Sequence, residues 1–131
     1  MTRSGNKTIV ALALFSVCGC SGGEQGPMLA GGREVKSWLA ALHDPKPQVR
    51  RQAVLKLGNV GDADPAAAEG LAEALRDKDA LIRSDAIHAV AKLTKPSETI
   101  LAQLKVMSDS DREARVRDNA KKALKHFGVA E

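Results

Sequence analysis

Hydrophobic residues recur with the period of an α-helix through most of the chain, from about residue 33 to residue 128. Three segments share one arrangement. An aliphatic residue precedes an arginine, an alanine follows the aliphatic residue by four positions, and apolar residues follow at four and seven positions more. These steps trace one face of a helix with 3.6 residues per turn. The alanine at the middle of each face lets neighbouring helices approach closely. The three alanine-centred faces are Ala53, Leu57 and Val60; Ala86, Val90 and Leu93; and Ala120, Leu124 and Phe127.

A second amphipathic helix is predicted before each of these three. Asp64 and Pro65 offer an N-cap and a first-turn proline, and Ser97 begins another helix. Gly61 and Gly128 are placed where a left-handed residue ends a helix. The sequence therefore predicts helix pairs over about 33–61, 64–94 and 97–128, stacked as an all-α solenoid. Their apolar faces contain Val35, Trp38, Leu39 and Leu42; Leu71 and Leu75; and Ile100, Leu101, Leu104 and Met107.

An aspartate stands six residues before the arginine of each repeat, in the turn between the two helices. The pairs are Asp44 and Arg50, Asp77 and Arg83, and Asp111 and Arg117, with the arginines 33 and then 34 residues apart. In the third repeat Asp109 is an alternative, because the turn is two residues longer. Such an aspartate can cap the following helix or pair with an arginine one turn inside it.

This pattern resembles HEAT repeats, in particular the short bacterial HEAT-like type first noted in phycobilisome lyases. The shared features are the Asp-x5-Arg spacing, the Val/Ile-Arg-x-x-Ala core and the Leu-x-x-apolar-Gly close of the first repeat. The second repeat departs from it with Thr94 in place of glycine, and the third with its longer turn. The resemblance implies an α-α superhelix in which aspartate and arginine form a hydrogen-bonded ladder. We assign that ladder to Asp44, Arg50, Asp77, Arg83, Asp111 and Arg117.

The same resemblance implies a binding surface, because the second helix of each repeat lines the concave side in that family. The polar residues directly after each ladder arginine are candidates for this surface. An ordinary solvated face is the alternative. The candidate positions are Arg51, Gln52, Ser84, Asp85, Asp118 and Asn119.

The N-terminus has the pattern of a secretory signal. A short basic segment with Arg3 and Lys7 precedes ten mostly apolar residues, 8–17. Ten residues span only about 15 Å as a helix, which is too short to cross a bilayer. The sequence Val17-Cys18-Gly19-Cys20 resembles a bacterial lipobox read on Cys20, which implies removal of residues 1–19 and lipidation of Cys20. Read on Cys18, the match is poor. A cytosolic protein with an apolar N-terminal helix is the alternative.

Residues 20–32 are rich in glycine and predict a disordered, flexible tether between a lipid anchor and the folded repeats. Because no cysteine follows Cys20, the mature domain holds no disulfide framework. We expect a protein held at the bacterial cell envelope by its lipid, on an inner or outer membrane that these residues do not specify.

No catalytic motif is present, and we expect neither enzymatic activity nor a cofactor. His43, His88 and His126 occupy different positions within their repeats. They lack the paired His and Glu spacings that bind zinc or two irons, so no metal site is expected.

Without Arg3 and Lys7 the chain has 18 basic and 16 acidic residues, a balance that does not indicate nucleic acid as a partner. Residues 62–79 carry a net charge of −4 and residues 112–126 a net charge of +4. The basic last helix could dock on anionic lipid headgroups or an acidic protein, or be a solvated face. We expect a protein partner, bound as a scaffold or in an accessory or maturation role for an enzyme. The oligomeric state is left open.

Overall fold

Six α-helices and no strand make up residues 34–129, the part of the chain that the computed structural model describes. The prediction of an all-α fold is confirmed. The helices are α1 (Val35–Ala41), α2 (Pro47–Gly58), α3 (Pro65–Ala74), α4 (Ala80–Val90), α5 (Glu98–Ser110) and α6 (Ala114–His126).

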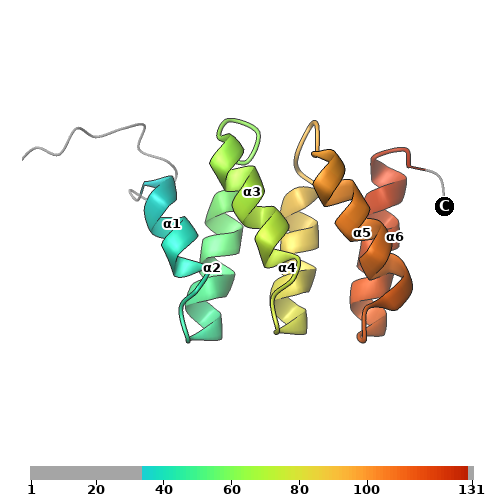
Figure 1. Cartoon of the computed structure of the whole chain (residues 1–131), viewed down its shortest axis with the longest axis horizontal. Helices are drawn as coiled ribbons and strands as arrows, with labels where there is room; N and C mark the ends of the chain where they lie inside the picture. Colours follow the sequence, from blue (N-terminus) through green and yellow to red (C-terminus); the bar gives the residue numbers. More distant parts are fainter. Residues whose placement is uncertain (1–33, 130–131) are drawn as a thin grey trace, which may run out of the picture.

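The helices form three antiparallel pairs that stand side by side in two layers (Figure 1). Helices α1, α3 and α5 form one layer, and α2, α4 and α6 form the other. Each even-numbered helix packs against its own odd-numbered partner, and α4 also packs against both α2 and α6. Contacts within the odd-numbered layer are fewer. Most same-layer contacts between neighbouring repeats are therefore made by the even-numbered helices.

The core is a single cluster built from the apolar faces that the periodicity predicts. The three central alanines, Ala53, Ala86 and Ala120, are completely buried. Leu71 and Leu75 of the second repeat are buried to the same degree. Among the predicted core residues, only three are partly exposed: Leu39, Leu101 and Phe127.

Helices α2 and α4 approach most closely where Gly58 meets Ala89. A Cβ atom built on Gly58 would lie 2.8 Å from the Cβ of Ala89 and 3.3 Å from its Cα. The second of these atoms is backbone and cannot swing aside, so a side chain at Gly58 would force the two helices apart. A glycine at this position sets the spacing between the first and second repeats.

The predicted role of Gly61 as a left-handed helix stop is wrong. Within residues 34–129 only Gly128 has a positive φ, of +69°. Helix α2 ends earlier, with Asn59 in a right-handed conformation at its C-cap. Gly61 instead makes room for a neighbouring repeat, since a Cβ there would lie 2.6 Å from a methyl of Leu93.

Three helices begin with the side-chain cap that a polar residue can supply. The Asp64 carboxylate accepts a hydrogen bond from the N–H of Ala66, and Ser97 accepts one from Ile100. Asp79 caps α4 in the same way. These caps satisfy backbone donors that have no partner inside the helix.

The two extra residues of the third repeat extend a helix and do not distort the turn. Helix α5 has 13 residues, against 10 in α3, and it contains Asp109. Asp111 follows it and occupies the turn position of Asp44 and Asp77.

The predicted signal peptide, Cys20 and the tether lie outside the described residues. Within residues 34–129, no helix combines the length and apolarity needed to span a membrane.

Candidate functional site

Two buried arginines tie each repeat to the next. Arg50 donates from Nε and Nη2 to the two carboxylate oxygens of Asp77, at 2.9 and 3.2 Å. Arg83 makes the same paired contact with Asp111, at 2.9 Å for both bonds. We call each such arginine–aspartate contact between consecutive repeats a rung. Two parallel charge-assisted hydrogen bonds fix both distance and orientation, so each rung sets the register of neighbouring repeats.

Within a repeat, the arginine binds the backbone of its aspartate and not the carboxylate. The Nη1 atom donates to the aspartate carbonyl oxygen at 2.9, 2.9 and 2.6 Å in the three repeats, and to the following carbonyl at 3.3 Å. The ladder expected along the stack therefore has two kinds of arginine contact. Within a repeat the arginine binds the aspartate carbonyl, and between repeats it binds an aspartate carboxylate. The pairs joined through a carbonyl are Asp44 and Arg50, Asp77 and Arg83, and Asp111 and Arg117.

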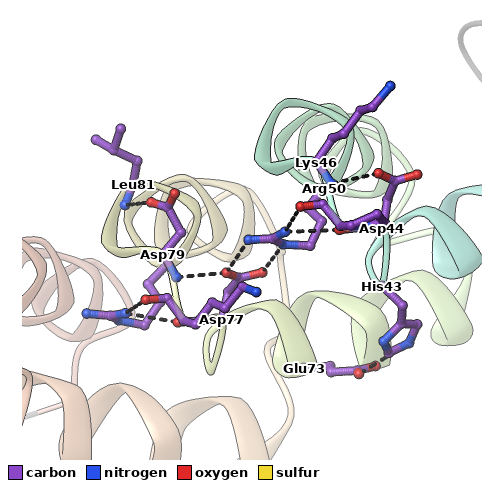
Figure 2. A network of polar contacts seen from close by, with 11 residues as sticks. His43, Asp44, Lys46, Arg50, Glu73, Asp77, Asp79 and Leu81 are labelled. Carbon is purple, nitrogen blue, oxygen red and sulfur yellow. Dashed lines mark hydrogen bonds and ion pairs between the residues drawn. The ribbon is translucent and has the colours of Figure 1, made fainter.

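The aspartates share one local conformation, which aims their carboxylates. In each turn, Oδ1 accepts a hydrogen bond from the N–H two residues on, at 2.8, 2.8 and 3.0 Å. Figure 2 shows Asp44 with Lys46, and Asp77 between Asp79 and Arg50. This side-chain turn holds the aspartate through its own backbone, independently of any arginine.

The two rungs are buried ion pairs. The side chains of Arg50 and Asp77 are 6% and 10% exposed, and those of Arg83 and Asp111 are 9% and 7% exposed. The hydrogen bond that Arg50 donates to Asp77 raises the pKa of Arg50, and the one that Arg83 donates to Asp111 raises the pKa of Arg83, in each case against the effect of burial. Burial alone would raise the pKa of Asp111, but hydrogen bonds from Arg83 and the Glu113 N–H lower it overall.

The stability of the stack should consequently depend on the ionisation of Asp111. Its folded pKa lies below the unfolded value of about 3.9. The stabilisation is therefore complete above that unfolded value and is lost as pH falls through the folded pKa. We expect the wild type to exceed Asp111→Asn in free energy of unfolding at neutral pH, with a difference that shrinks below about pH 4. Urea unfolding across pH measures this difference, and exposed Asp109→Asn is the matched control. A constant difference down to pH 2 would contradict it.

A second row of polar contacts crosses the even-numbered helices. Arg51 of α2 forms an ion pair with Asp85 of α4, and Asn119 of α6 donates to the Ser84 hydroxyl at 2.8 Å. Ser84 is only 3% exposed. Four of the six candidate surface residues therefore brace the stack.

The remaining two candidates, Gln52 and Asp118, are exposed at opposite ends of this row. We name the surface formed by all six residues the even-helix face. Contacts between helices link its centre, and polar side chains are exposed at both ends. Sequence reasoning placed these residues together but missed their pairing. The available signal was their separation, 34 residues for Arg51 and Asp85 and 35 for Ser84 and Asn119.

Thr94, which replaces the glycine of the repeat pattern, also has a structural role. Asp62, in the loop after α2, accepts hydrogen bonds from the Thr94 backbone N–H at 2.8 Å and hydroxyl at 2.7 Å. These two bonds lower the pKa of the Asp62 carboxyl. A glycine at position 94 would lack the hydroxyl, so the threonine adds a link between repeats at the opposite end from the rungs.

The histidines do not converge. His43 lies 3.4 Å from the Glu73 carboxylate at an exposed site (Figure 2), whereas His88 is exposed on α4. His126 packs edge-to-face with Phe127, with ring centroids 5.3 Å apart. Among residues 34–129, no group of three or more His, Cys, Asp or Glu side chains is arranged to hold a metal ion.

A family model that describes HEAT repeats matches residues 35–125. The paired helices, the two rungs and the buried alanine at the centre of each repeat agree with this match. The chain belongs to the HEAT repeat family. No match is found among curated proteins. HEAT repeats are commonly scaffolds for protein interaction, which is the coarse function that membership supports.

Proposed function

We propose that this HEAT protein is a lipid-anchored scaffold at the bacterial cell envelope, where it binds another protein through the even-helix face. The observation that carries the binding role is the bracing of that face. Three helices are held in one register by two contacts, one between Arg51 and Asp85 and one between Asn119 and Ser84. A pre-organised surface loses little conformational entropy when a partner binds, which favours recognition of a shaped protein surface.

The face can be tested by photocrosslinking in a bacterial host. A photoreactive amino acid is placed in the full chain at Gln52 or Asp118, and at Glu69 of α3 as the matched exposed control. We expect a discrete crosslinked envelope protein from the first two positions and none from Glu69. Equal crosslinking from α3 would contradict the choice of face. If the captured partner is an enzyme whose activity depends on this chain, the accessory role follows.

The membrane anchor rests on the lipobox resemblance at Cys20 and on the glycine-rich residues 21–32. Expression of the full chain should yield a protein that begins at Cys20, carries acyl chains in mass spectra and sediments with membranes. Cys20→Ser should abolish all three properties, because the thiol is the acylated group. Cys18→Ser, two residues away, should leave them intact. An unmodified Met1 on the wild-type chain would contradict the anchor and favour a cytosolic HEAT protein.

A further inference from the structure

The last ladder arginine is built like the two that form rungs but contacts no carboxylate within residues 34–129. Arg117 donates from Nη1 to the carbonyl oxygens of Asp111 at 2.6 Å and Arg112 at 3.3 Å. Arg50 and Arg83 use Nη1 in the same way. Within residues 34–129, Nε and Nη2 of Arg117 have no hydrogen-bond partner.

Those two atoms are the ones that receive an aspartate in the complete rungs. Because Nη1 is held by the same two carbonyls, the Arg117 guanidinium is oriented before any ligand arrives. It therefore presents a two-donor fork that matches one carboxylate. Arg117 is partly exposed, so a ligand from outside the stack can reach it. We name this unfilled position the open rung.

The surface beside the open rung is basic and not apolar. Val54 and Ile87 each lie four residues after a rung arginine and are buried, but the equivalent residue of α6 is the exposed Lys121. Lys125 follows one turn later and is also exposed. Arg117, Lys121 and Lys125 thus form one stripe along α6, at a spacing of four residues. A stripe of three cations is suited to an acidic partner. A further apolar repeat stacked on α6 would bury Lys121 and Lys125, which is unfavourable.

We propose that this end of the stack is a docking site for an acidic segment of another protein. An aspartate or glutamate of that segment completes the open rung on Arg117, and further acids pair with Lys121 and Lys125. The inference rests on the proposed scaffold function and names the chemistry of its partner. It places the contact at the α6 end of the even-helix face, next to Asp118.

A second copy of this chain fits the open rung less well. Its Asp44 carboxylate could reach Arg117, since within residues 34–129 no arginine contacts it. Stacking in register would, however, also repeat the contact that joins Gly58 of one repeat to Ala89 of the next. The equivalent positions across the new junction are Lys125 and Lys56 of the second copy. Two lysines would meet where a glycine and an alanine touch, which opposes stacking by both size and charge.

The probe for this site is a fluorescein-labelled synthetic peptide with the sequence of residues 62–80. This segment has a net charge of −4 and contains Asp77, which fills a rung in the intact stack. The matched probe carries Asp77→Asn. Binding to the full-length protein in detergent is followed by fluorescence anisotropy at low ionic strength, where charge pairing is least screened.

We expect Arg117→Ala to weaken peptide binding by about tenfold or more, because two charge-assisted hydrogen bonds are lost. Arg117→Lys should weaken it nearly as much, since lysine keeps the charge but not the fork. Arg115→Ala removes an equal charge from an exposed position two residues before Arg117, off the stripe, and should change binding by less than about threefold. The Asp77→Asn peptide should bind the wild type as weakly as the original peptide binds Arg117→Ala.

Equal losses for Arg117→Ala and Arg115→Ala, or no saturable binding of the peptide, would overturn the proposal. So would a stable dimer of the wild type in sedimentation that Arg117→Ala dissolves, because that result assigns the open rung to a second copy. Binding to phosphatidylglycerol vesicles that both arginine variants weaken equally, without peptide binding, would assign α6 to lipid. Crosslinking from Gln52 that persists in Arg117→Ala would show that the scaffold function stands even if the open rung does not.

Discussion

Replacing Ile87 with lysine is expected to unfold most of the stack, with a loss of at least about 3 kcal/mol in free energy of unfolding. Ile87 is 1% exposed. It lies four residues after Arg83 and three after Ser84, both of which bond to the third repeat. The side chain therefore lies on the surface of α4 that α6 covers. A lysine there would place an unpaired charge between two helices, where burial strongly disfavours it.

The reverse exchange is the matched control. Lys121 occupies the equivalent position in α6 but is exposed, so Lys121→Ile should change the free energy of unfolding by less than about 0.5 kcal/mol. Both variants can be measured as full-length protein by urea unfolding followed with circular dichroism at 222 nm. If Ile87→Lys remained as stable as the wild type, the inference that this surface of α4 is sealed by α6 would fail.

Replacing Arg83 with alanine is expected to cost about 3 kcal/mol in free energy of unfolding. The variant loses two bonds to Asp111 and two to carbonyl groups of its own repeat. It also leaves the Asp111 carboxylate, 7% exposed, without its cation. An unpaired buried charge is the larger part of this cost, because the hydrogen bonds alone are partly replaced by water.

Arg117→Ala separates the rung from the arginine's other contacts. Arg117 makes the carbonyl contacts of Arg83 but no carboxylate contact among the described residues. Its removal should therefore cost less than about 1.5 kcal/mol. Equal losses in the two variants would mean that the carbonyl contacts, and not the rung, provide the stabilisation. Urea midpoints measured at pH 7 with both proteins in the same detergent make the comparison direct.

A stack with two complete rungs is well suited to a scaffold. The rungs lie at one end of the helix pairs, and the Asp62–Thr94 contact lies in the loops that follow α2 and α4. Between the first and second repeats, links at both ends of the helix pairs therefore restrain the twist. Arg51 and Asp85 add a third link on the even-helix face.

The sequence alone predicted the helical repeats because each depends on local chemistry. The apolar period, the caps at Asp64 and Ser97 and the small central alanines all act within one helix or one helix pair. The resemblance to HEAT repeats also identified the residues of the ladder. It paired each aspartate with the arginine of its own repeat, and so did not anticipate which arginine the carboxylate binds.

Only the tertiary structure decided that question. Asp77 lies six residues before Arg83 and 27 after Arg50, and its carboxylate binds the more distant arginine. Two constraints give this result. Oδ1 of Asp77 accepts the N–H of Asp79, which fixes the carboxylate locally. The Arg83 guanidinium binds the carbonyls of its own turn through Nη1 and the Asp111 carboxylate through Nε and Nη2.

Gly61 follows the same logic, since the close contact at its Cβ position is with a methyl of Leu93 in the next repeat and its own backbone angle is not left-handed. Contacts between repeats join residues about 30 positions apart, so helical periodicity contains no information about them. They depend on the distance and angle at which two helix pairs stack, which the packing of Gly58 on Ala89 and the two rungs set together.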